Sequence, residues 1–319
     1  SAVFNQPEER IETKMNKIAF LCSGQGSQAP GMGKELYDFC PGSKRVYECG
    51  SDILGYDLAK LSFEGTPETL APTNISQPAI FAVSMAAYAA VKEYCTPDAV
   101  GGHSLGEYAA LTIAGAFSLE DGFRVIAARG AAMQKAADAH PGAMYAIVGS
   151  NEETIEQVCS QTEGYVLPVN FNAPAQTVIA GDAEAAAKAA DTLAASGAKA
   201  VKLAVASAFH SKLMESAAIA FSDAIASVPV KAPSIPFYAN LTGKLLPADT
   251  DLKEYLAKHL VSGVRFHQEV GEMAQNGIST FLELGPGKVL TSLIKRNFKQ
   301  VSAYNVENLK NLNKWKETL

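Results

Sequence analysis

The sequence predicts an α/β protein built around a mostly parallel sheet. Short apolar runs typical of buried strands alternate with longer stretches of helical pattern over most of the 319 residues. This order places helices on the faces of a parallel sheet. Glycine-rich segments at 23–28 and 285–287 stand where strands would turn into helices. Between 142 and 206 the pattern changes, and we expect a smaller unit there.

The first part of the chain contains the clearest strand and the clearest buried helix. Residues 17–22 are a short apolar run before a glycine-rich loop, which predicts a strand. Residues 77–94 are apolar nearly all round, which predicts a buried helix. In order, we expect a strand at 17–22, helices at 33–39 and 77–94, a strand at 99–101, and helical structure from 107 to about 139 with a break at Gly115 and Ser118.

The middle of the chain predicts the order βαββαβ. Asn151 and Thr154 form an N-cap pattern ahead of an apolar position, which marks the first helix. The strands are expected at 143–148, 166–170, 176–180 and 200–205, and the helices at 151–161 and 184–196. This order is that of the ferredoxin-like unit, so residues 142–206 are expected to be a ferredoxin-like subdomain inserted into a larger core.

The last part of the chain returns to the larger core. We expect helices at 211–228, 252–260, 265–276 and 289–297, and strands at 235–240 and 280–284. The expected core therefore comprises residues 15–141 and 207–308, followed by a polar, helix-compatible tail at 309–319. Residues 1–14 are polar and patternless, which predicts a leader or a disordered extension.

Composition argues against several classes of function. The formal charge of −6, without a long Lys/Arg run, argues against a nucleic-acid partner. The five cysteines show no C-x-x-C spacing and the five histidines no metal-ligand spacing, so neither a disulfide nor a metal is expected. No run approaches the roughly 20 apolar residues of a membrane span. We expect a cytoplasmic monomer with no membrane association, no metal and no bound cofactor.

Residues 102–106 read GHSLG and match G-x-S-x-G. In this turn a serine leaves a strand, enters a helix and exposes its hydroxyl at the top of an α/β-hydrolase sheet. An apolar run precedes the motif and a helical run follows it, as the turn requires. The core is therefore expected to be α/β-hydrolase-like, with Ser104 as a nucleophile that forms an acyl-enzyme. The alternative is a glycine-rich turn that contains a serine by chance.

A serine nucleophile needs a base, and His210 is the best candidate of the five histidines. It lies where the inserted unit returns to the core, a plausible position for a cleft. His103 is expected to point away from the serine hydroxyl and to pack. His140 precedes a proline on a loop, and His259 and His267 stand in helical stretches. A structural role for His210 stays open on spacing alone.

Five motifs in register carry a resemblance to a known family. They are GQGSQ at 24–28, GHSLGEY at 102–108, RGAAMQ at 129–134, AFHSKLM at 208–214 and ELGPGKVL at 283–290. Together they resemble malonyl-CoA:acyl carrier protein transacylases and the related acyltransferase domains of polyketide synthases. The resemblance extends from about residue 15 to residue 308.

The resemblance implies an [acyl-carrier-protein] S-malonyltransferase of fatty-acid biosynthesis. Ser104 would attack the thioester of malonyl-CoA while His210 takes its proton. The backbone N–H groups of Gln25 and Leu105 would hold the oxyanion. The phosphopantetheine thiol of acyl carrier protein would then take the malonyl group from the serine in a ping-pong scheme. The implied partners are malonyl-CoA and acyl carrier protein, used as substrates.

Arg129 and Phe209 would determine which acyl group is used. A guanidinium can hold the free carboxylate of a malonyl group bidentately, which lysine does less well. The resemblance places the carboxylate-binding arginine at Arg129; a surface arginine is the alternative. Phe209 and Leu105 resemble residues of malonyl-selective members, and a phenyl ring would fill the space that an α-methyl group needs.

The sequence departs from the usual serine triad and from the family pattern. The family has no acidic third member, and a backbone carbonyl in a stretch resembling 256–260 commonly orients the base. His259 stands there instead of Gln or Asn, so we expect its backbone carbonyl near the base. Ser23 stands where proline is usual, which puts the rigidity of the first loop in doubt. Asn172 is expected to line the cleft, with a structural role in a turn as the alternative.

Two other functions remain open from the sequence. One is a discrete acyltransferase that serves polyketide synthase modules in trans, which carrier-protein preference would distinguish. The other is a serine thioesterase or hydrolase, because esterases share the GHSLG-type turn. A hydrolase has no need of Arg129 and usually has an acidic triad member.

Overall fold

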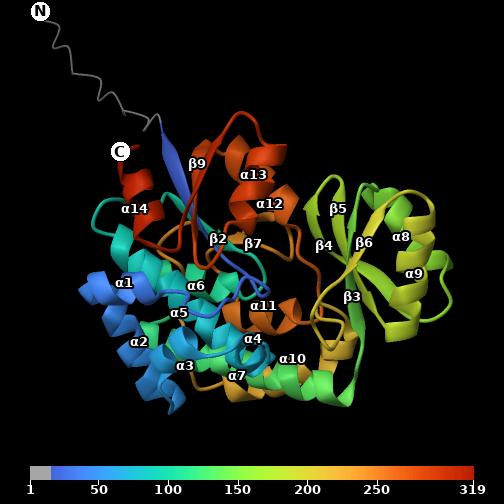
Figure 1. Ribbon diagram of the computed structural model, residues 1–319, viewed down its shortest axis with the longest axis horizontal. Coiled ribbons are helices and arrows are strands. Elements are labelled where there is room, and N and C mark those ends of the chain that lie inside the picture. Colours follow the sequence, from blue (N-terminus) through green and yellow to red (C-terminus); the bar gives the residue numbers. More distant parts are fainter. Residues whose placement is uncertain (1–15) are drawn as a thin grey trace, which may run out of the picture.

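The computed structural model describes residues 16–319. The expected leader at 1–14 lies outside the described residues. Figure 1 shows two bodies side by side: a larger one that contains β1, β2 and β9, and a smaller one that contains β3 to β6 with α8 and α9. The chain enters the smaller body after α7 and leaves it after β6.

The larger body is built on a parallel sheet of order β10-β9-β1-β2. Its strands are β1 (Lys17–Cys22), β2 (Ala99–Gly102), β9 (Ile278–Leu284) and β10 (Ser302–Val306). Side chains of β1 alternate between the two faces, as strand geometry requires. Phe20 packs in the cluster with α5 to α7, and Leu21 packs with α12 and α13. Both faces are therefore buried, which explains why the strand is apolar throughout.

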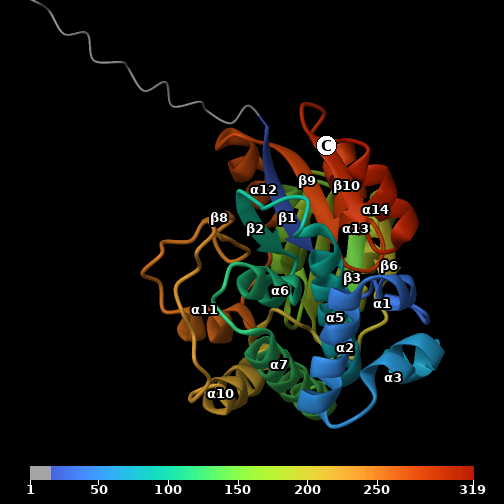
Figure 2. The ribbon, with the colours of Figure 1, turned by 90° about the vertical axis from the view of Figure 1, so that its left-hand side faces the viewer.

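Helices cover the sheet and extend beyond it. The first group is α1 (Lys34–Phe39), α2 (Pro41–Leu54), α3 (Leu58–Glu64), α4 (Pro67–Leu70), α5 (Thr73–Val91), α6 (Gly106–Ile113) and α7 (Leu119–Ala139). The second group is α10 (Glu215–Ala224), α11 (Leu252–His259), α12 (Phe266–Gln275), α13 (Val289–Asn297) and α14 (Leu309–Lys316). In Figure 2, α2, α5 and α7 lie next to one another beneath the sheet. The mixed α/β architecture with a parallel sheet agrees with the sequence prediction.

The smaller body contains an antiparallel sheet of order β4-β5-β3-β6. Its elements are β3 (Ala143–Val148), α8 (Glu152–Gln161), β4 (Val166–Ala173), β5 (Gln176–Gly181), α9 (Ala183–Ala195) and β6 (Lys199–Lys202). Strand β6 ends three residues before the predicted position. It is an edge strand that pairs only with β3, and residues 203–206 leave it to line a cavity.

Two other predictions after the smaller body were too long. The predicted helix at 211–228 is a 3₁₀ turn, Lys212–Met214, followed by α10, which ends at Ala224. The predicted strand at 235–240 is reduced to β7 (Tyr238–Ala239), paired with β8 (Lys244–Leu245). Pro236 has no N–H group to donate to a ladder, so regular pairing begins only after it. Its carbonyl still accepts from the Val100 N–H at 2.9 Å.

The carboxyl ends of β1 and β2 lie together because the two strands are parallel neighbours. Cys22 pairs with Gly102 at the last position of the register. The loop at 23–28 and the GHSLG turn therefore leave the sheet side by side, which is where open α/β sheets form their sites. None of the helices formed by residues 16–319 is long and apolar enough to cross a membrane.

Candidate active site

Ser104 stands in a tight turn between β2 and α6 with φ 55°, in the left-handed region. This conformation costs a non-glycine residue about 1–2 kcal/mol, so the surrounding contacts must impose it. The two glycines of the motif allow the turn to close. A Cβ at Gly102 would collide with the Gly106 backbone, and one at Gly106 would collide with the Cys22 carbonyl. Both positions therefore require glycine.

His210 lies beside Ser104, with its Nε2 2.8 Å from the serine Oγ. The other ring nitrogen, Nδ1, lies 2.8 Å from the Ser262 carbonyl and 3.1 Å from the His259 carbonyl. Carbonyl oxygens only accept, so Nδ1 must carry the proton and Nε2 is free to accept the serine proton. His210 also has a left-handed backbone, with φ 63°.

The surroundings of His210 keep its ring neutral. Burial, followed by the charge of Arg129, lowers the pKa of His210 to about 3. The ring is only 3% exposed. A neutral imidazole with its acceptor nitrogen on the serine hydroxyl has the geometry of a general base.

The loop at 23–28 packs directly on the serine turn. A Cβ at Gly24 would lie 2.7 Å from the His103 carbonyl oxygen, so only glycine allows this approach. The Ser23 hydroxyl donates to the Glu283 carboxylate at 3.1 Å and anchors the start of the loop. Among the described residues, neither the Gln25 N–H nor the Leu105 N–H has a hydrogen-bond acceptor. These two donors are free to bind an anion.

Arg129 projects from α7 and is 0% exposed. Its guanidinium donates to the Gln77 side-chain oxygen at 3.0 Å and to the Ser104 Oγ at 3.2 Å. The ring of Tyr108 lies beneath it at 5.3 Å. Nε has no partner, and no carboxylate of residues 16–319 forms an ion pair with Arg129. A buried cation without an anion is costly, so this guanidinium is suited to receive a carboxylate.

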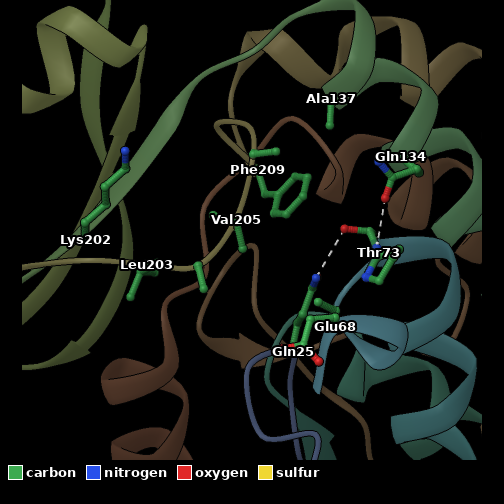
Figure 3. A pocket seen from close by; sticks show the side chains of 13 residues that line it. Gln25, Glu68, Thr73, Gln134, Ala137, Lys202, Leu203, Val205 and Phe209 are labelled. Carbon is green, nitrogen blue, oxygen red and sulfur yellow. Dashed lines mark hydrogen bonds between the residues drawn. The ribbon is translucent and has the colours of Figure 1, made fainter. Parts of the chain in front are cut away.

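A cavity of about 340 Å³ opens onto Ser104 and His210. Its lining includes Gln25, Ser104, Met133, Met144, Phe209 and His210. A second, wider hollow of about 640 Å³ shares Gln25, Phe209 and residues 202–205 with it. Figure 3 shows this hollow, with Phe209 and Val205 facing Thr73 and Gln25 across it. The two hollows therefore adjoin, and their lining residues come from both bodies.

Comparison with known proteins assigns the family. The model of the acyl transferase domain matches residues 19–317, which is nearly the whole chain. The chain belongs to this acyl transferase family. The malonyl CoA-acyl carrier protein transacylase of Bacillus subtilis (strain 168) is 40% identical over 287 residues, which cover 88% of this chain and 90% of that protein.

A second curated relative and a solved structure are also similar to this acyl transferase over nearly its whole length. The malonyl CoA-acyl carrier protein transacylase of Haemophilus influenzae is 38% identical over 311 residues, 96% of this chain and 100% of that protein. A malonyl-transacylase solved in complex with its type II polyketide acyl-carrier protein has a TM-score of 0.91 and 36% identity. That match covers 95% of this chain and 100% of the other.

Asn172 is tied to the serine turn of this acyl transferase rather than to the cavity. Its Oδ1 lies 2.8 Å from His103 Nε2, and it is not among the residues that line either hollow. Asn170 lines the smaller cavity instead, and its buried Oδ1 has no partner. No motif marks Asn170, and simple strand alternation does not identify it, because the register of β4 is irregular between Pro168 and Asn170 and between Phe171 and Ala173.

Several buried polar residues around the acyl transferase site were not predicted from the sequence. Asn240 accepts from the Ser104 N–H at 2.8 Å. Glu107 accepts from the Tyr255 hydroxyl at 2.9 Å, and its Oε1 lies 3.2 Å from His259 Nδ1. Burial raises the pKa of Glu107 to about 8. In the part of the chain that the structure describes, no cluster of His, Cys, Asp or Glu could hold a metal ion.

Proposed function

We propose that this acyl transferase moves a malonyl group from malonyl-CoA to the phosphopantetheine thiol of acyl carrier protein, for fatty-acid biosynthesis. The observation that carries the proposal is the buried, unpaired guanidinium of Arg129 beside the Ser104 hydroxyl. An acyl group with a free carboxylate supplies the missing anion. The names of the relatives describe the same transfer.

In the first half-reaction, Ser104 Oγ attacks the thioester carbonyl while its proton passes to His210 Nε2. The Gln25 and Leu105 N–H groups stabilise the negative oxygen of the tetrahedral intermediate. The C–S bond then breaks, and His210 returns the proton to the sulfur of coenzyme A. The product is a malonyl ester on Ser104.

In the second half-reaction, the carrier thiol attacks this ester. Its proton passes through His210 to Ser104 Oγ as the C–O bond breaks, which regenerates the enzyme. Met133, Met144 and Phe209 line the cavity with apolar surface. This lining disfavours ordered water near the ester, so the thiol competes well with hydrolysis.

Arg129 also provides selectivity among acyl groups. A malonyl carboxylate pairs with the guanidinium, whereas an acetyl group leaves a buried charge unpaired. Phe209, which is 5% exposed and lines the cavity, restricts the space next to the acyl group. We therefore assign malonyl rather than methylmalonyl as the acyl unit.

We also propose a two-part organisation for the chain. Residues 15–141 and 207–308 form an α/β-hydrolase-like core, and residues 142–206 form a ferredoxin-like subdomain. The sheet order β4-β5-β3-β6 with two helices supports the subdomain assignment. The GHSLG turn after a parallel strand supports the core assignment.

A second candidate is transfer of malonyl groups to polyketide carrier proteins. The solved complex of a related malonyl-transacylase with a type II polyketide acyl-carrier protein favours it. A hydrolase is less well supported, because backbone carbonyls rather than an acid face His210 Nδ1.

The test follows labelled malonyl-CoA with and without phosphopantetheinylated acyl carrier protein. Without the carrier, we expect the label to stay bound to the enzyme. When the carrier is added, we expect the label to move from the enzyme to the carrier. Fatty-acid and polyketide carriers, assayed side by side, separate the two pathways by their relative rates. Rapid release of free malonate at a rate independent of the carrier would overturn the transferase in favour of the hydrolase.

A further inference from the structure

We propose that Asn240 is a positioning residue that holds Ser104 in its left-handed conformation for attack. The inference rests on the proposed serine chemistry and adds a residue that no motif identifies. Asn240 directly follows β7, is 0% exposed, and lies 136 positions from the serine.

The side-chain amide of Asn240 forms hydrogen bonds with the serine turn at two points, and we call this pair of hydrogen bonds the clamp. Its Oδ1 accepts from the Ser104 N–H at 2.8 Å. Its Nδ2 donates to the Gly102 carbonyl at 2.6 Å. The amide therefore bridges the last residue of the strand and the serine itself, across the position where the chain reverses. A planar amide has both a donor and an acceptor at a fixed separation, which matches these two backbone groups.

The other polar groups of Asn240 fix the amide in this orientation. Nδ2 also lies 3.2 Å from a Glu269 carboxyl oxygen. A flipped amide would place Oδ1 against the Gly102 carbonyl and Nδ2 against the Ser104 N–H, so only one orientation fits. The backbone N–H donates to Glu107 at 2.9 Å, and the backbone carbonyl accepts from the Arg265 N–H at 2.9 Å. Asn240 is thus held by α6 and by the N-terminal part of α12 with the residue before it.

The same polar cluster reaches His210. Glu107, which accepts from Asn240, also contacts Tyr255 and His259. The His259 carbonyl in turn lies 3.1 Å from His210 Nδ1. Nucleophile and base are therefore positioned from one buried cluster, so that a shift of Asn240 changes their mutual geometry.

The clamp also determines which backbone donors remain for the oxyanion. The Ser104 N–H is occupied by Asn240, whereas the Leu105 and Gln25 N–H groups are free. Without the clamp, the turn can relax toward ordinary backbone angles. This would move Oγ away from His210 Nε2.

The test compares Asn240→Ala and Asn240→Ser with Asn305→Ala. Asn305 is a part-buried asparagine on β10 that also donates to a backbone carbonyl, that of Gly287 at 3.3 Å. Single-turnover acylation by malonyl-CoA, labelling of Ser104 by a fluorophosphonate, and melting temperature are measured for each variant. Affinity for malonyl-CoA is measured in a Ser104→Ala background, with and without Asn240→Ala.

We expect both Asn240 variants to acylate about 100-fold more slowly, the loss typical of a 1 Å misplacement of a reacting group. Fluorophosphonate labelling should slow in parallel, and affinity for malonyl-CoA should stay within about twofold, as a misplaced serine leaves binding intact. Asn305→Ala should acylate at the wild-type rate even where its melting temperature falls. The proposal would be overturned if folded Asn240→Ala or Asn240→Ser acylated at a rate within about threefold of wild type. It would also be overturned if a weaker affinity for malonyl-CoA alone explained the slower acylation.

The fluorophosphonate separates this proposal from the proposed function. A wild-type protein that reacts with the reagent but not with malonyl-CoA would contradict malonyl transfer, while slow labelling of the Asn240 variants would still support the clamp. Each variant is assayed below its own melting temperature, so that unfolding does not enter the comparison.

Discussion

Arg129 is the residue whose surroundings best support the proposed acyl group. It is buried, has a free Nε, and donates to Ser104 Oγ and to Gln77. These contacts hold the guanidinium in one orientation before any substrate arrives. This buried charge supports the proposal that the site takes an acyl group with a free carboxylate.

Replacement of Arg129 should therefore change selectivity as well as rate. A charge-assisted hydrogen-bonded pair contributes about 1.5–3 kcal/mol, so Arg129→Ala should lower malonyl transfer about 10- to 100-fold. Acetyl transfer should fall less or rise, because the unpaired charge is removed. Competition between malonyl-CoA and acetyl-CoA measures the ratio, and Arg124→Ala, an exposed arginine of the same helix, is the control. Equal losses for both acyl groups would contradict the assigned role.

The pKa of His210 gives a second prediction at this scale. Burial and the charge of Arg129 lower this pKa to about 3, so the free enzyme retains its neutral base at any pH well above that value. A base is lost only as the pH falls through its pKa. The value of kcat/KM for acylation, which reports free-enzyme groups, should therefore stay flat from about pH 8 to about pH 5. A loss centred near pH 6.5, the ordinary histidine value, would contradict this environment.

Residues with a motif could be identified from the sequence, and residues without one could not. Ser104, His210 and Arg129 were predicted from the sequence, and the structure brings the three side chains together. Ser262 was not predicted, because it contributes its backbone carbonyl, which a residue of any type could supply. Asn240 was missed because its contacts with the serine turn span more than 130 positions and end on backbone atoms.

Among the elements, the loop at 23–28 depends most clearly on a single glycine, Gly24, for its position beside the serine turn. A Cβ at Gly24 would lie 2.7 Å from the His103 carbonyl, so Gly24→Ala should push the loop and its Gln25 N–H away from the serine turn. Loss of one oxyanion donor costs about 100- to 1,000-fold in kcat. We expect a loss of that order, measured as the acylation rate constant, with little change in melting temperature.

Gly271→Ala is the matched control for this loop. Gly271 lies in α12, and an added Cβ would meet only the Phe298 ring at 3.7 Å, an ordinary contact. Alanine is favoured over glycine in a helix by about 1 kcal/mol, so this variant should be fully active and at least as stable. If Gly24→Ala were equally active, the loop would not supply an oxyanion donor.

Elements with strong local signals were predicted well, and those shaped by distant contacts were not. Strands β1, β2 and β9 were predicted within about two residues, because each is an apolar run closed by glycine. Helices α2 to α4 and strand β10 were not predicted. Strand β7 is short because Pro236 and the chain before it cannot pair regularly. Asn240 directly follows this strand and is thereby placed next to the Ser104 N–H.

The whole molecule brings the site together from segments far apart in the chain. The serine turn and Arg129 come before the smaller body, while His210 and Asn240 come after it. Residues 203–206 leave β6 and line the wider hollow before the chain reaches His210. The sequence could predict the α/β class, the change of texture at 142, and a cleft near the point where the inserted unit returns to the core. It could not predict which residues of the two bodies line that cleft, because periodicity carries no information on how layers meet.

The proposed function requires that this assembly form a malonyl ester on one serine, Ser104. The most direct measurement is peptide mapping by mass spectrometry after brief reaction with malonyl-CoA and an acid quench. We expect the mass of one malonyl group on the peptide that contains Ser104, no such adduct in Ser104→Ala, and much slower formation of the adduct in His210→Ala. Turnover with no adduct on Ser104, or an adduct on another residue that is competent for transfer, would contradict it.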